Sequence, residues 1–165
     1  MSIEQRGLRW WLALALAICV LDQMTKLAAA SYLSYGVPLS VMPGFNLTLV
    51  HNTGAAFSLL NQAAGWQRWL FSAIALVVAV GVIAWLSRMG PAQRWGPCAL
   101  AFILGGAIGN LIDRLQLGYV VDFIEVYYHE WSWPAFNVAD SAITIGALML
   151  ILRGPGQVVP RTIAD

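Results

Sequence analysis

Two aspartates, Asp122 and Asp140, lie at the ends of a segment rich in Trp and Tyr that connects two very apolar stretches of the chain. Only 10% of the residues are charged, whereas 59% are hydrophobic. Burying carboxylates in such surroundings is costly, so acids at the edge of apolar segments indicate a function. Two carboxylates held close together in a poorly solvated place share one proton, and one then acts as a base and the other as an acid. Such a pair can activate a water molecule for attack on a peptide carbonyl group without a metal ion.

Three side chains with hydrogen-bond donors accompany this pair: Asn52, Asn110 and Arg114. Donors of this kind would position a substrate backbone or stabilise a developing oxyanion. Two simpler interpretations stand beside this one. Asn52 would bond its own backbone in a turn. Asn137 and Asp140 are three residues apart and would form a capping box, so that Asp140 does no more than cap a helix.

The position of Asp140 also bears on which acid carries the shared proton. If a helix begins near Asn137, Asp140 lies in its first turn, where the positive end of the helix dipole favours the carboxylate anion. Asp122 would then hold the proton. Because the two acids titrate together, this assignment is a preference for one of two protonation states of the pair.

A second acid–base pair, Asp22 and Lys26, occurs in the first apolar run at a spacing of four residues. On a helix these two side chains share a face, with the acid on the N-terminal side, which is the favourable order. The simpler interpretation is a charge pair near the membrane boundary with Lys26 snorkelling towards the interface. The functional one is that the pair braces the site or contacts substrate. Asp113 is expected to pair locally with its neighbour Arg114.

The elements that must hold these side chains are four apolar runs, at about residues 10–32, 69–86, 98–112 and 137–152. A helix needs about 20 residues to cross a bilayer, so we expect a mainly α membrane protein with four transmembrane helices, the last one short. The whole chain, residues 1–165, is expected to form a single domain. The first run also has features of a cleavable signal peptide, with Ala28 and Ala30 at the cleavage site. Gly105 and Gly109 have the GxxxG spacing that allows helices to approach closely.

Between the first two runs the hydrophobic pattern breaks, at residues 35–67. Gly and Pro residues punctuate this stretch, and residues 45–50 alternate apolar with polar side chains. Such alternation predicts a strand with one wet face, and therefore a small sheet outside the bilayer.

Composition excludes several other classes of protein. The net charge is +1 and the basic residues are dispersed, so no nucleic-acid partner is expected. Cys19 and Cys98 lie in apolar runs without a second ligand at metal-binding spacing, so we expect no disulfide framework, no metal site and no cofactor.

The basic residues between the runs predict the orientation of the chain. With four spans they fall on one side of the membrane, which the positive-inside rule assigns to the cytoplasm. Both termini are then cytoplasmic, and the aspartate pair faces outward. The basic residues that predict this orientation are Arg6, Arg9, Arg88, Arg94, Arg153 and Arg161.

Five segments in this order resemble one known family, the lipoprotein signal peptidases (signal peptidase II) of the bacterial inner membrane. They are residues 22–26 (Asp-Gln-Met-Thr-Lys), 52–58 (Asn-Thr-Gly-Ala-Ala-Phe-Ser), 105–114 (Gly-Gly-Ala-Ile-Gly-Asn-Leu-Ile-Asp-Arg), 121–123 (Val-Asp-Phe) and 136–141 (Phe-Asn-Val-Ala-Asp-Ser). The resemblance implies four transmembrane helices, a β-cradle on the periplasmic side, and a periplasmic helix or loop between spans three and four.

The same resemblance implies an aspartic endopeptidase that cleaves diacylglyceryl-modified prolipoproteins just before the lipidated Cys. Asp122 and Asp140 would be its catalytic dyad, and Asp113 would have a more structural role. The implied partners are the prolipoprotein substrate, membrane lipid and globomycin-type cyclic peptide inhibitors, with the enzyme expected as a monomer. The residues implied to surround or support the dyad are Asn52, Asn110, Arg114, Asn137, Asp22 and Lys26.

Three rival functions remain open on the residues alone. A small proton-coupled transporter or channel would use Asp22, Asp122 and Asp140 as a relay through the bilayer. A serine peptidase would pair Lys26, as the base, with a nucleophile chosen from Ser31, Ser58 and Ser141. A non-enzymatic scaffold would remain functional without either aspartate of the dyad.

Overall fold

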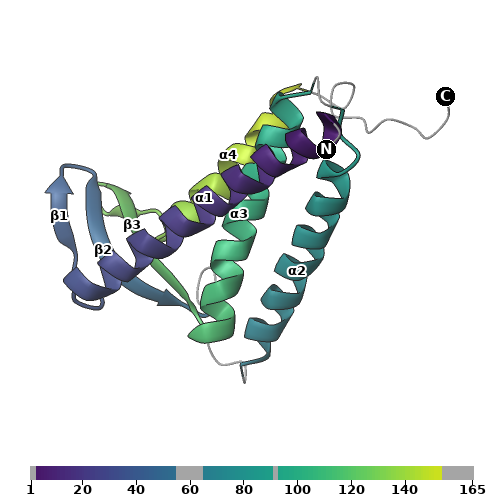
Figure 1. Ribbon diagram of the computed structural model, residues 1–165. Helices are drawn as coiled ribbons and strands as arrows, with labels where there is room; N and C mark the ends of the chain where they lie inside the picture. Colours follow the sequence, from purple (N-terminus) through teal and green to yellow (C-terminus); the bar gives the residue numbers. More distant parts are fainter. Residues whose placement is uncertain (1–2, 55–64, 91–92, 154–165) are drawn as a thin grey trace.

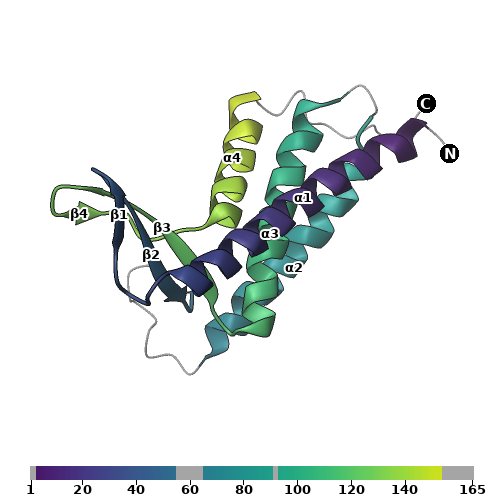
Figure 2. The same ribbon diagram turned by 60° about the vertical axis from the view of Figure 1, so that its left-hand side comes forward.

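The computed structural model describes residues 3–54, 65–90 and 93–153, with side chains from Gly7 to Leu152. Within these residues the chain is mainly helical, with a small antiparallel sheet beside one end of a helix bundle, as Figures 1 and 2 show. The four helices are α1 (Ile3–Tyr32), α2 (Trp66–Leu86), α3 (Trp95–Gln116) and α4 (Val138–Arg153).

Each predicted apolar run forms one helix. Three of the described helices are long and apolar enough to cross a membrane, namely Gly7–Tyr32 in α1, all of α2 and all of α3. The fourth has 16 residues. At 1.5 Å per residue it is about 24 Å long, somewhat less than the hydrocarbon core of a bilayer. The prediction that the last helix is short is therefore confirmed.

Helix α3 lies at the centre of the bundle, because small residues let its neighbours approach closely. A Cβ atom on Gly105 would lie 2.6 Å from the carbonyl oxygen of Ala15 in α1, and one on Gly109 would lie 2.5 Å from a carboxylate oxygen of Asp22. Helix α4 packs against the adjoining face, where a Cβ on Gly106 would overlap the carbonyl oxygen of Ala139. The glycine spacing thus serves helix packing, as expected.

The sheet has the strand order β1-β2-β3-β4, and all its pairs are antiparallel. The predicted strand at residues 45–50 is present as part of β2. Its pairing with β3 sets Val50 opposite Asp122 and Asn52 opposite Val120. This register brings a segment near the start of the chain beside the first aspartate of the pair. The strands are β1 (Leu39–Met42), β2 (Phe45–Asn52), β3 (Val120–Tyr128) and β4 (Trp131–Ser132).

The segment between α3 and α4 contains more than had been implied. A helix or loop was implied between spans three and four; this segment forms no helix, and besides its loops it supplies β3 and β4 to the sheet. Its β-branched and aromatic residues favour extended structure. The first four residues of β3 are all buried, so the sequence lacks the alternation that marks a strand with one wet face.

Candidate active site

The two aspartates come from different elements. Asp122 lies in β3, is 1% exposed, and accepts hydrogen bonds from the amide of Asn137 (2.7 Å) and from that of Asn52 (2.8 Å). Asp140 lies in the first turn of α4 and accepts one from the amide of Asn110 (2.7 Å). Asparagine donors thus hold both carboxylates, and they come from β2, α3 and the residue before α4.

Asn137 contacts both acids and is completely buried. Its side-chain amide donates to Asp122, while its backbone N–H donates to Asp140 Oδ2 at 3.3 Å. In return the backbone N–H of Asp140 donates to Asn137 Oδ1 at 2.9 Å. The capping box is therefore formed, but Asp140 does more than cap, because its other carboxylate oxygen faces Asn110.

The environment of Asp122 favours its protonated form. Burial, and next the charge of Asp140, raise the pKa of Asp122 from 3.8 to about 7, against the hydrogen bonds from Asn52 and Asn137. Desolvation and a nearby like charge both disfavour a carboxylate anion. This residue is consequently suited to hold a proton near neutral pH.

Asn52 both forms a turn and donates to the site, so both interpretations of this residue hold. Its side-chain oxygen accepts a hydrogen bond from the backbone N–H of Gly54 at 2.8 Å, which makes the expected turn. Because the oxygen is occupied in this way, the amide nitrogen is directed at Asp122. The turn thereby fixes the orientation of a donor to the site.

Lys26 does not snorkel to the interface, so the simpler of its two interpretations was wrong. Its side chain is 3% exposed, and its ammonium group contacts Asp22 (2.8 Å), Asp113 (2.9 Å) and the side-chain oxygen of Asn110 (2.8 Å). These three contacts use all three N–H groups of the ammonium. The last one leaves the Asn110 amide nitrogen to face Asp140. The buried partners in α3 also show that α1 is an integral part of the bundle.

The two acids paired with Lys26 hold the backbone next to Asp122 and Asp140. Asp22 Oδ1 accepts a hydrogen bond from the N–H of Ala139 (2.8 Å), the residue before Asp140. Asp113 Oδ2 accepts one from the N–H of Val121 (3.0 Å), the residue before Asp122. Asp113 was expected to pair with Arg114, but it pairs with Lys26 instead.

Sequence reasoning missed Gln23, whose amide also donates to Asp113 (2.8 Å). Its place inside the segment 22–26 was the available signal. Arg114 is half-buried at the end of α3 and donates a long hydrogen bond, 3.5 Å, to the carbonyl oxygen of Asn110. Its positive charge acts on both Asp140 and Asp122.

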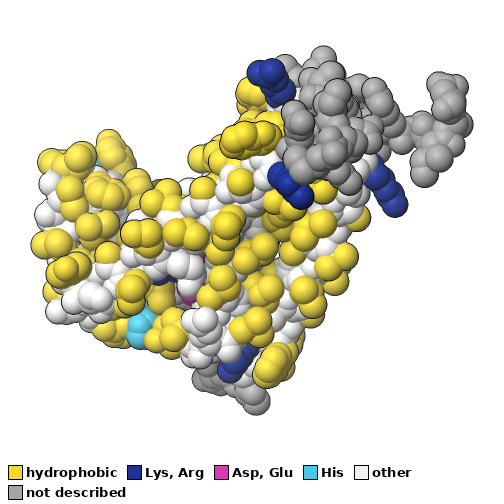
Figure 3. Space-filling view, in the orientation of Figure 1, with side chains coloured by type: hydrophobic (Ala, Val, Ile, Leu, Met, Phe, Trp, Pro, Cys, Tyr) yellow, Lys and Arg dark blue, Asp and Glu magenta, His cyan; other side chains and the backbone are white. Residues whose placement is uncertain are grey.

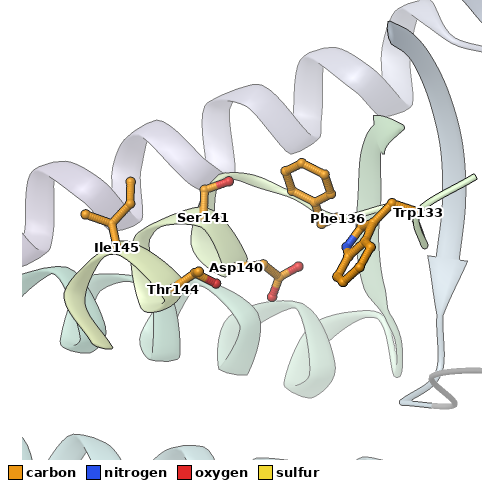
Figure 4. A pocket seen from close by; sticks show the side chains of 6 residues that line it. All are labelled: Trp133, Phe136, Asp140, Ser141, Thr144 and Ile145. Atoms are coloured by element: carbon orange, nitrogen blue, oxygen red, sulfur yellow. The ribbon is translucent and has the colours of Figure 1, made fainter. Parts of the chain in front are cut away.

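A pocket of about 360 Å³ opens beside Asp140. Figure 4 shows the Asp140 carboxylate pointing from α4 towards the side of the pocket formed by Trp133 and Phe136. Figure 3 shows acidic atoms within a hollow between the sheet and the helices, surrounded by a mostly hydrophobic surface. Sequence reasoning placed Trp133 among aromatic residues suited to the membrane interface and gave it no role in the site, because nothing in such a run shows which residue turns towards an acid.

The serine peptidase alternative finds no support in the described part of the chain. The hydroxyl of Ser31 donates to Leu27 O and that of Ser141 to Asn137 O, while Lys26 is fully engaged with its three partners. Ser58 lies outside the described residues. Within residues 3–54, 65–90 and 93–153, no group of three or more His, Cys, Asp or Glu side chains could hold a metal ion.

A model of the signal peptidase (SPase) II family matches residues 14–154. The chain belongs to this family. A lipoprotein signal peptidase of Acinetobacter baylyi is 52% identical over 142 residues, which cover 86% of this chain and 79% of that protein. Another, from Alteromonas mediterranea, is 51% identical over 149 residues, covering 90% and 81%.

A solved structure described as a bacterial membrane enzyme at 2.3 Å resolution superposes with a TM-score of 0.76. It is 29% identical in sequence, and the match covers 87% of this chain and 85% of that one. The resemblance seen in the five segments is thereby confirmed. The protein is a signal peptidase II family member, hence a peptidase and a hydrolase, and the transporter alternative is not favoured.

Proposed function

We propose that this family member removes signal peptides from diacylglyceryl-modified prolipoproteins by cleaving just before the lipidated Cys, with Asp122 and Asp140 as its catalytic dyad. One observation carries the assignment of the dyad. The buried Asn137 bonds to both carboxylates, so acids from a strand and a helix converge on one residue. The names of the relatives support the substrate class.

In this mechanism Asp140 is the base and Asp122 the acid. Asp140 takes a proton from a water molecule as the water oxygen attacks the scissile carbonyl carbon, while Asp122 gives its proton to the carbonyl oxygen. When the resulting gem-diol collapses, Asp122 takes back a hydroxyl proton and Asp140 protonates the leaving amine nitrogen. The dyad returns to its starting state, and one water molecule has been consumed.

Two features support this assignment of the proton. The pKa of Asp122 is raised to about 7 by burial and by the charge of Asp140. Asp140 lies in the first turn of α4, where a backbone N–H and the amide of Asn110 donate to its oxygens and the helix dipole favours an anion.

The surrounding donors then have distinct roles. Asn52 and Asn137 orient Asp122, Asn110 orients Asp140, and Arg114 supplies positive charge for the developing oxyanion. Asp22 and Lys26 support the dyad from α1. No cofactor enters this scheme.

The proposed setting is the bacterial inner membrane, with all four helices spanning and the sheet and dyad on the periplasmic side. Both termini would be cytoplasmic. Figure 3 supports this orientation, because most of its visible Lys and Arg side chains lie at the end of the bundle away from the sheet. Lipid would cover the apolar helices, and a single copy, residues 1–165, would form one domain. Globomycin-type cyclic peptides would block the site. The arginines at the helix ends distant from the sheet are Arg9, Arg88, Arg94 and Arg153.

The proposal is tested with purified protein in detergent and a diacylglyceryl-modified prolipoprotein. We expect the parent to release the signal peptide, and Asp122→Asn and Asp140→Asn each to fold but lose activity by a factor of about 10⁴ or more, since removing a member of a catalytic unit costs about that much. The matched control is Glu125→Gln, because Glu125 lies on the same strand but bonds to Thr48 and Ser132.

This control should cleave at the parental rate. Cleavage at that rate by either aspartate variant would reject the dyad. Proton flux into liposomes that disappears in Asp122→Asn, in a protein that cleaves nothing, would instead favour the transporter.

A further inference from the structure

Helix α2 has so far had a packing role only, through apolar residues such as Val82 and Leu86 that contact α3 near its start. At the opposite end of α2, one half-buried aromatic side chain, Phe71, reaches the site. Two residues of the site meet its ring. They are Gly54, next to the end of β2, and Arg114, near the end of α3.

The first contact braces the turn that orients Asn52. A Cβ atom on Gly54 would lie 2.6 Å from two carbon atoms of the Phe71 ring, so the backbone of the turn rests directly against the ring. Gly54 also has a φ of 97°, which favours glycine. Its N–H occupies the side-chain oxygen of Asn52 and so directs the amide nitrogen at Asp122. The ring therefore helps to orient one carboxylate of the dyad, through Gly54 and Asn52.

The second contact holds the guanidinium of Arg114. Its Cζ atom lies 5.4 Å from the centroid of the Phe71 ring, within the range of a cation–π interaction. The hydrogen bond from Arg114 to Asn110 O is long, at 3.5 Å, and on its own constrains the planar group weakly. A flat aromatic face is therefore well suited to fix its orientation beside the two carboxylates.

We propose that Phe71 is a positioning residue of the peptidase, which holds Arg114 and the Asn52 turn against the dyad from the opposite side of the site. This inference rests on the proposed function of the dyad. It gives α2 a part in catalysis that its mostly apolar sequence did not indicate. The ring itself touches neither carboxylate in this scheme, so its effect is on the rate of the chemical step rather than on substrate binding.

The test measures kcat and KM with a synthetic diacylglyceryl lipopeptide that carries a fluorophore and a quencher on either side of the scissile bond. Phe71→Leu keeps the apolar volume but removes the aromatic face. We expect its kcat to fall about threefold to tenfold, the range that loss of a partly desolvated cation–π contact gives. KM should stay within about twofold of the parental value, because the lost interaction acts on the transition state. Phe71→Tyr retains the face and should restore kcat.

The matched control is Trp69→Leu. Trp69 lies two residues away on the same helix and also has an arginine over its ring, with Arg68 Cζ 4.9 Å from the ring centroid, but it is 62% exposed. A spacing of two residues puts it on a different face of the helix from Phe71. It should leave both kinetic constants unchanged. Thermal unfolding followed by Trp fluorescence checks that each variant folds, and Phe71→Met replaces Phe71→Leu if the latter does not.

Three results would overturn the inference while leaving the peptidase intact. They are a parental kcat in the Phe71 variant, an equal loss in Trp69→Leu, and a loss confined to KM. A parent that leaves the lipopeptide uncleaved would instead reject the proposed function, and this inference with it.

Discussion

At the scale of single residues, the proton that the proposed mechanism assigns to Asp122 predicts how activity depends on pH. The mechanism needs one proton on the pair, and the pKa of Asp122 is raised to about 7 by burial and by Asp140. Below that pH the proton is present. Above it both acids are ionised, so we expect kcat to fall about tenfold per pH unit once the pH exceeds about 7. A profile of kcat from pH 5 to 9 measures this, and a rate that continues to rise up to pH 9 would contradict the assignment of the acid.

The five segments that resemble the signal peptidase II family named the side chains that gather around the two aspartates, but they did not give the orientations of these side chains. The same segments named Asn52, Asn110 and Asn137, yet which end of each amide faces a carboxylate depends on partners that lie 15 to 84 residues away in the chain. Lys26 shows the limit most clearly, because its burial depends on two acids that fold around it. Local sequence alone left a snorkelling side chain and a bracing one equally open.

At the scale of elements, helices were predictable and the second half of the sheet was not. Apolar runs of about 20 residues have few alternatives to a membrane helix. Strand β3 carries no such signal, since its first four residues are all buried and lack alternation. It forms because β2 offers a partner in the register that sets Val50 opposite Asp122. That partner lies about 70 residues earlier in the chain, and a local pattern does not reveal it.

The close packing of α3 on α4 makes a prediction at this scale. A methyl group on Gly106 would overlap the carbonyl oxygen of Ala139, next to Asp140, so Gly106→Ala must push α4 away. We expect a loss of about 1–3 kcal/mol in the free energy of unfolding, typical of overpacking, together with reduced activity. Unfolding by denaturant in detergent micelles measures the first, and lipopeptide cleavage the second.

Gly81→Ala is the matched control for this change, because it places the same methyl group on a helix where nothing lies within 4 Å. Alanine should leave stability unchanged there or raise it slightly, since alanine is the better helix former. Equal losses from the two substitutions would mean that helix propensity, rather than the contact with α4, sets the cost.

At the scale of the whole molecule, the two ends of the bundle differ in the number of basic side chains, and this difference bears on the orientation of the chain in a membrane. The ends of α2 and α4 and the beginnings of α1 and α3 meet at the end opposite the sheet, where most of the visible basic side chains lie (Figures 1 and 3). Lys and Arg are retained on the cytoplasmic side during insertion. The dyad, beside the sheet, would therefore face the compartment in which lipidated precursors present their signal peptides. There the acyl chains of the substrate would hold the scissile bond at the membrane surface, which lowers the entropic cost of positioning it.

Cysteine labelling tests this orientation directly. Replacing Cys19 and Cys98 by Ala removes both native thiols, after which Ser40→Cys in β1 and Ser87→Cys, just after α2, each place one exposed thiol at opposite ends of the molecule. In spheroplasts, a membrane-impermeant maleimide should label Ser40→Cys at once and Ser87→Cys only after the membrane is permeabilised, because the charged reagent does not cross the hydrocarbon core. The reverse pattern would place the dyad in the cytoplasm. The two acids could then not reach the cleavage site of a precursor that presents this site on the periplasmic side of the membrane.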